Sequence, residues 1–168
     1  MAKHSQLEEA YKNHARMVYG FLLAQTGDPD TAEELTQETF YQAVKSSSRF
    51  DESCKISTWL CAIAKNVLLA YRKKQHGSPR PFADTELPPA SETDSSAEES
   101  ALGKIRRMEL MQRLHALPDP MREVLYLRLL GDLSFREIGE ILGHTENWAR
   151  VTFYRGKEKL KEEKEESK

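Results

Sequence analysis

Apolar residues recur at steps of three and four in two parts of the chain, which a long polar stretch separates. The polar stretch, 77–97, holds most of the prolines together with many serines and acidic residues, a composition that cannot bury a core. The periodic parts predict three helices before it and four after it: 7–24, 30–45, 57–74, 98–117, 120–129, 134–142 and 145–160. We therefore expect an all-α protein with two small helical domains, 1–76 and 98–168, joined by a flexible acidic Pro/Ser-rich linker at 77–97.

Polar residues at the helix ends refine this prediction in the first domain. Asp30, with Glu33 three residues later, is the predicted N-cap of the second helix, and Ser57 that of the third. The second helix would turn Leu35, Phe40, Ala43 and Val44 inward. Arg72, Lys73 and Lys74 end the third helix, where cations favour the helix dipole whether or not they bind anything.

The stretch 130–160 has the layout of a helix-turn-helix. Ser134 and Glu137 form a predicted capping box, and Gly143 stands where the first helix must stop. In the second helix Ala149, Phe153, Gly156 and Leu160 share one face and should pack inward. The side chains left outside are suited to base edges and phosphates in a major groove: Arg150, Val151, Tyr154, Arg155 and Lys157.

A plain helical hairpin with a solvated basic face would show a similar local pattern, so the charge distribution matters. The net charge is only −2, which does not by itself indicate nucleic-acid binding. The stretch 77–100 carries six acidic residues against one arginine, however, and basic residues outnumber acidic ones between residues 102 and 160. DNA is therefore the first partner to consider for the second domain.

Several other classes of protein find no support in the sequence. There is no apolar run long enough for a membrane span and no N-terminal signal pattern, so we expect no membrane insertion and a cytoplasmic location. Cys54 and Cys61 lack matched histidines for a zinc site and should stay reduced. We expect no catalytic residues, no metal and no cofactor, because no nucleophile or ligand motif is present.

Three motifs in this order resemble the sigma-70 family of bacterial RNA polymerase sigma factors, in its short extracytoplasmic-function group. They are EELTQETF at 33–40, ISTWLCAIAKN at 56–66 and ALPDPMREVLYLRLLGDLSFREIGEILG at 116–143. The resemblance covers nearly the whole chain. It implies a subunit that binds core RNA polymerase, recognises promoter DNA through two elements and helps to melt the duplex, and an anti-sigma factor that inhibits it.

In the first domain the resemblance assigns Glu34, Gln37 and Glu38 to contact with the polymerase clamp, and a polar acidic face suits a basic helical partner. The loop from 50 to 56 would capture a base flipped from the minus-ten element. The implied DNA contacts of this domain are Phe50, Ser53, Lys55, Lys65, Asn66, Arg72, Lys73 and Lys74, with Trp59 either a core residue or a wedge at the melted junction.

In the second domain the resemblance implies that the minus-thirty-five element is contacted by Arg150, Val151, Tyr154 and Arg155, with Trp148 and Lys157 beside them. The chain departs from the family pattern at Trp148, Thr152, Gly156 and Ala70. Because of these departures, the resemblance does not predict which promoter sequence the chain recognises. They do not change the expected fold.

Two other functions stay open at this stage. A conventional helix-turn-helix regulator would bind duplex DNA alone, as a dimer, but it needs neither the Gln37–Glu38 helix nor the Trp59 helix. A helical adaptor without DNA binding would make the basic face of Arg150 and Arg155 incidental. An enzyme is the least favoured class.

Overall fold

Helices make up all the regular structure of the computed structural model, which describes residues 2–50, 53–74 and 101–166. Within those residues there are seven α-helices, one short 3-10 helix and no strand. Their bounds are α1 Ala2–Thr26, α2 Pro29–Lys45, η1 Ser47–Arg49, α3 Ile56–Lys74, α4 Ala101–Ala116, α5 Met121–Leu129, α6 Phe135–Leu142 and α7 Glu146–Glu166. The all-α prediction is thus confirmed, whereas the linker predicted at 77–97 lies outside the described residues.

The predicted N-cap of α2 was wrong by two residues. The helix begins at Pro29, and Asp28, not Asp30, occupies the N-cap position, where its carboxylate accepts a hydrogen bond from the Thr31 hydroxyl at 2.6 Å. Proline suits the first helical position because its ring holds φ near the helical value. The first N–H groups of a helix have no acceptor within the helix, so the N–H that proline lacks costs no hydrogen bond there. Val44, predicted to face inward, is 49 % exposed.

The predicted cap of α3 was also misplaced. The helix starts at Ile56, and the amide of Trp59 donates to the carbonyl oxygen of Lys55 at 3.1 Å, so Ser57 lies inside the first turn. As predicted, Leu60, Ala64 and Leu68 are buried on the inward face of this helix.

The helix-turn-helix prediction is confirmed in its local chemistry. The amide of Glu137 donates to the Ser134 hydroxyl at 3.1 Å, and the amide of Ser134 donates to the Glu137 carboxylate at 3.2 Å. Gly143 has φ +75° and ends α6 in the left-handed conformation. Glycine adopts this conformation at little cost because it has no Cβ atom. Thr145 then caps α7 by accepting from the Trp148 amide at 3.1 Å.

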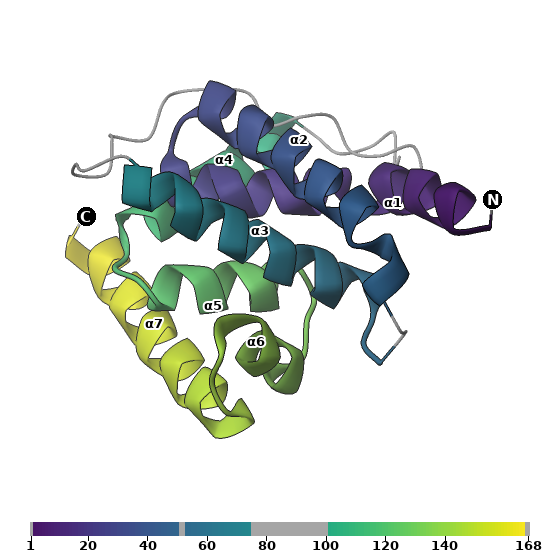
Figure 1. The fold of residues 1–168 in the computed structure, drawn as a ribbon. Helices are drawn as coiled ribbons and strands as arrows, with labels where there is room; N and C mark the ends of the chain where they lie inside the picture. Colours follow the sequence, from purple (N-terminus) through teal and green to yellow (C-terminus); the bar gives the residue numbers. More distant parts are fainter. Residues whose placement is uncertain (1, 51–52, 75–100, 167–168) are drawn as a thin grey trace.

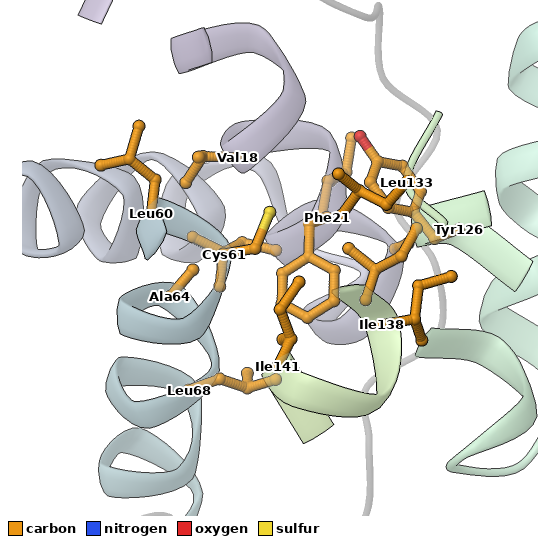
Figure 2. Close-up of a cluster of buried hydrophobic side chains, with 14 of the residues drawn as sticks. Val18, Phe21, Leu60, Cys61, Ala64, Leu68, Tyr126, Leu133, Ile138 and Ile141 are labelled. Atoms are coloured by element: carbon orange, nitrogen blue, oxygen red, sulfur yellow. The ribbon is translucent and has the colours of Figure 1, made fainter. Parts of the chain in front are cut away.

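The helices before and after the linker pack against each other through one buried cluster. In Figure 1, α6 lies against α3, and α1 contacts both α4 and α5. Figure 2 shows the cluster, in which Val18 and Phe21 of α1 and Leu60 of α3 meet Tyr126 of α5 and Ile138 of α6. The sequence predicted two helical groups but gave no sign of this shared core.

Candidate protein- and nucleic-acid-binding surfaces

One face of α2 carries the residues predicted to bind polymerase. Glu34, Gln37 and Glu38 are all exposed, and their spacing of three and four places them on the same side of the helix. The opposite side is fixed in the core by Leu35 and Ala43. The outward direction of these three side chains therefore follows from the burial of the other face.

A groove of about 700 Å³ runs between α2 and α3. Glu34 and Glu38 line its α2 side, while Asn66 and Lys74 line its α3 side. The structure thus brings two residues predicted to contact polymerase next to two residues predicted to contact DNA. Gln37 does not line this groove.

Two aromatic rings of the predicted DNA-binding set lie together at the start of α3. The ring centroids of Phe50 and Trp59 are 4.8 Å apart, and their planes meet at 32°. Phe50 also borders a hollow of about 360 Å³ whose other wall is α1, with Asn13 and His14 among its lining residues. Burial lowers the pKa of His14, which keeps the ring neutral near pH 7.

Lys55 and Ser53, predicted to act in the same loop, are exposed. Residues 51–52 of that loop lie outside the described residues. A hollow next to an aromatic pair is the kind of site in which an unstacked base can be held.

Three of the cations predicted to contact DNA make ion pairs with the second half of the chain. The ammonium of Lys65 lies 2.7 Å from the carboxylate of Glu123, and that of Lys55 lies 3.6 Å from Glu137. The guanidinium of Arg72 lies 3.0 Å from the carboxylate of Asp119. In contrast, Lys73 and Lys74 are exposed at the end of α3.

Hydrogen bonds reinforce this contact between the halves. Thr58 donates its hydroxyl hydrogen to Glu137 at 2.7 Å, and Arg122 donates to the side-chain oxygen of Gln25 at 2.9 Å. His115 and the carbonyl oxygen of Ala24 are 2.8 Å apart. The sequence predicted none of these contacts, although Glu137 was predicted to form the capping box with Ser134.

The carboxylates at this contact differ in their electrostatic environment. Burial raises the pKa of Glu123, and the charge and hydrogen bond of Lys65 only partly oppose this. Burial acts in the same direction on Glu137, but hydrogen bonds from Thr58 and Ser134 and the charge of Lys55 outweigh it and lower the pKa. In the sequence, Glu123 is one of three charged residues of α5, with Arg122 and Arg128, so nothing there singled it out.

The second helix of the helix-turn-helix turns its predicted residues outward. Arg150, Val151, Tyr154 and Arg155 are exposed, while Ala149, Phe153 and Gly156 are buried. The Arg150 guanidinium lies 3.2 Å from Glu146, one turn earlier in α7. Long donors are thus presented on one face of a helix whose other face is packed.

The remaining residues of this helix have particular placements. Trp148 stacks on His144 with ring centroids 3.7 Å apart, and the Lys157 ammonium lies 5.5 Å from the Phe153 ring centroid. Thr152 is buried, so it does not belong to the outward face. A Cβ at Gly156 would lie 2.9 Å from the side chain of Leu125, which explains why a glycine serves here.

The cysteines and acidic groups form no metal-binding cluster in the part of the chain that the structure describes. Neither Cys54 nor Cys61 forms a disulfide, and burial raises the pKa of Cys61 to about 12. In that same part, no helix is both long and apolar enough to cross a membrane.

Comparison with known families gives two matches that together cover most of the chain. Residues 10–77 match the family model described as sigma-70 region 2, and residues 107–160 match sigma-70, region 4.

Individual proteins are similar over nearly their full length. The chain is 32 % identical over 158 residues to the RNA polymerase sigma factor CarQ of Myxococcus xanthus, covering 92 % of this chain and 87 % of that protein. It is 30 % identical over 156 residues to the ECF RNA polymerase sigma factor SigM of Bacillus subtilis, covering 92 % and 93 %.

A solved structure has a similar fold. The structure of CnrH in complex with the cytosolic domain of CnrY matches with a TM-score of 0.69, covering 98 % of this chain and 91 % of that one. The two sequences are 16 % identical, so this match concerns the fold alone.

Proposed function

The chain belongs to the sigma-70 family of RNA polymerase sigma factors, in its extracytoplasmic-function group. From this premise we propose which of its surfaces bind polymerase and which bind promoter DNA. As a sigma factor it binds core RNA polymerase, directs it to particular promoters and helps to open the duplex there. It acts by binding, without catalysing a reaction of its own. Its place of action is the cytoplasm, where bacterial polymerase and DNA meet.

Two separate exposed surfaces on one chain carry this proposal. The α2 face offers carboxylates and an amide to a basic helical partner. The α7 face offers two arginines and a tyrosine to a DNA groove. A DNA-binding protein that works alone needs only the second of these surfaces.

We assign residues 1–76 to polymerase binding and the minus-ten element, 77–97 to a linker, and 98–168 to the minus-thirty-five element. In the first part, Glu34, Gln37 and Glu38 contact the clamp of the polymerase. Lys65, Asn66 and Arg72 hold the separated strand, together with Lys55, Lys73 and Lys74. Phe50, Ser53 and Lys55 receive a flipped base by stacking and edge contacts, which the hollow beside Phe50 supports, and Trp59 lies at the melted junction.

In the second part, Arg150 and Arg155 contact base edges, since arginine can bind guanine through two hydrogen bonds. Val151 and Tyr154 lie between them, and Trp148 and Lys157 lie at the border of the same surface. The family also implies an anti-sigma factor as a partner, which inhibits by covering surfaces that polymerase or DNA would use.

The direct experiment is run-off transcription with purified core polymerase on a fragment library from the host genome, with and without this protein. Specific new start sites that require the protein would establish the function and define both promoter elements. If no starts arise and the protein alone binds duplex DNA tightly, it is a conventional helix-turn-helix regulator.

A further inference from the structure

Phe135, the first residue of α6, lies at the centre of a cluster of aromatic and basic side chains in the helix-turn-helix. Its ring centroid is 5.4 Å from that of Phe153 and 6.5 Å from that of Tyr154, both on α7. The guanidinium carbon of Arg128, in the last turn of α5, lies 4.5 Å from the centroid of the same ring. The ring is only partly buried, so it packs on the core and also borders the outward face of α7.

Two contacts hold the side chain of Arg150, the first arginine on that outward face. Its guanidinium carbon lies 5.5 Å from the ring centroid of Phe135, and its Nη2 group donates to the carboxylate of Glu146 at 3.2 Å. A guanidinium is attracted to the face of an aromatic ring and can stack on it. Because Phe135 belongs to α6 and Glu146 to α7, the guanidinium is held relative to both helices of the helix-turn-helix.

The guanidinium of Arg150 can still bind a base while it is held in this way. Arginine has five N–H donors, of which the Glu146 carboxylate accepts one and a guanine edge accepts two. The side chain of Arg150 is 45 % exposed, so the remaining donors can be reached from the solvent. An arginine that is already ordered loses less conformational freedom on binding than a mobile one, which increases its affinity for the base that it fits.

Arg155, the other arginine proposed to contact bases, provides a comparison within the same helix. It is exposed on α7, five residues after Arg150. Among the residues that the structure describes, no carboxylate forms an ion pair with Arg155 and no aromatic ring lies next to its guanidinium. The two arginines should therefore differ in mobility, and Arg150 should be the more restricted.

We propose that Phe135, together with Glu146, is a positioning residue that orients Arg150 toward one base pair of the minus-thirty-five element. Phe135 then sets the promoter preference at that base pair through Arg150, and the preference read by Arg155 does not depend on it. This inference rests on the proposed function of α7 as the helix that reads the minus-thirty-five element.

The test uses the full chain bound to core polymerase and a promoter recovered by run-off transcription. A set of duplexes changes each base pair of the minus-thirty-five element in turn, and the preference at a position is the ratio of Kd for the changed and the original duplex. Phe135→Leu removes the ring but keeps an apolar side chain against Phe153. Phe135→Tyr keeps the ring, and Arg150→Ala identifies the base pair that Arg150 reads.

Phe135→Leu should reduce the preference at the base pair identified by Arg150→Ala by about two- to fivefold, the worth of an exposed contact between a cation and an aromatic ring. Phe135→Tyr should keep the wild-type preference. In the Arg150→Ala background, Phe135→Leu should change the preference no further, because the side chain that it positions is gone. A general defect in folding would instead raise Kd by the same factor for every duplex.

Glu146→Gln tests the second contact of Arg150. It should also lower the preference at the base pair that Arg150 reads. The matched control is Glu140→Gln, which removes an equal charge from an exposed pair of the same spacing on α6, where Arg136 lies 3.6 Å away. Both changes remove one negative charge and so raise the general affinity for DNA alike, but the control should keep the preference at every base pair.

A measurement on the free wild-type protein needs neither a variant nor a promoter. Nitrogen-15 relaxation of the arginine Nε–H groups should give Arg150 a higher order parameter than Arg155, because only Arg150 is held by a ring and a carboxylate. Equal mobility of the two side chains would overturn the inference. So would a Phe135→Leu variant that keeps the wild-type preference at every base pair or loses affinity equally for all duplexes.

The variants also separate the positioning from the proposed function. If Arg150→Ala changes the preference at no base pair, the assigned role of α7 is wrong and the positioning of Arg150 for base recognition falls with it. If Arg150→Ala changes the preference at one base pair and Phe135→Leu does not, the role of α7 stands and the positioning by Phe135 alone is wrong.

Discussion

The side chain of Tyr126 occupies the space that a Cβ atom at position 20 would need. The hydroxyl oxygen of Tyr126 lies directly over Gly20, and it donates its hydrogen to the carbonyl oxygen of Met17 at 2.8 Å. The ring is almost fully buried and also contacts Phe21, with centroids 5.9 Å apart. A glycine in the middle of α1 is thus part of the contact between the two halves.

Gly20→Ala should weaken the packing of α5 against α1. The added methyl group meets a buried hydroxyl, and overpacking of this kind costs about 1–3 kcal/mol. The change also favours α1 itself by about 0.5–1 kcal/mol, because glycine is a poor helix former. We expect a net loss of stability in urea unfolding, together with a larger radius of gyration.

Tyr126→Phe supplies the control for this prediction. Without the hydroxyl, the nearest ring carbon lies 3.2 Å from the new methyl group, so the double variant should be less damaged than the sum of the two single changes. Strictly additive effects would show that the two residues do not compete for this space.

Acid should weaken the closed structure through Glu137. Its folded-state pKa is below the ordinary value of 4.5, because hydrogen bonds from Thr58 and Ser134 and the charge of Lys55 outweigh the opposing effect of burial. A lowered pKa contributes stability above the unfolded-state pKa, and this contribution is lost as pH falls through the folded-state value. Urea unfolding measured from neutral pH down to about pH 3 should show this loss.

Glu137→Gln removes the titrating group, so its stability should change less over the acid range than that of the wild type. Glu140→Gln, on the same helix, should keep the wild-type dependence. The same acid slope in all three proteins would contradict the assigned role of Glu137.

Local signals allowed much of the fold to be predicted from the sequence. Ser134, Glu137 and Gly143 act through contacts within a few residues, so their residue types indicate the structure directly. The prediction failed at the start of α2, where Asp30 was predicted as the cap but Pro29 takes the first helical position and leaves Asp28 as the N-cap. Val44 was misassigned because helical spacing alone does not fix how wide the buried stripe is.

The contact between the halves could not be predicted in this way. Lys65 and Glu123 are 58 residues apart in the chain, and nothing in the spacing of either residue indicates the other. Lys65 was interpreted as a phosphate ligand through the resemblance to the sigma-70 family, which carries no information on the ion pairs of this chain. Its partner became visible only when α5 was placed against α3.

Gln37→Ala with Glu38→Ala should weaken binding to core polymerase. Both side chains are exposed, so the loss should come from the interface and not from the fold. We expect at least a tenfold increase in Kd, about 1.4 kcal/mol or more, measured by fluorescence anisotropy with purified core enzyme. Glu8→Ala with Glu109→Ala, at exposed positions on α1 and α4, should leave the affinity close to wild type. Unchanged binding in the α2 variant would exclude this face as the polymerase contact.

Arg150→Ala with Arg155→Ala should abolish promoter-directed transcription while leaving polymerase binding intact. Each specific contact of an arginine with a base is worth about 1–3 kcal/mol, so the loss should be about fivefold to about 150-fold per arginine. Lys12→Ala with Arg106→Ala removes the same charge at exposed positions on other helices. If the control lost as much activity as the α7 variant, general charge and not base recognition would explain the effect.

The central claim, that this chain makes core polymerase open a promoter, is tested most directly by permanganate footprinting of a promoter recovered from the run-off library. Thymines in the minus-ten region should become reactive only when core polymerase and this protein are both present. Reactivity with core polymerase alone, or a protein that binds the duplex while the thymines stay unreactive with both components present, would contradict the claim.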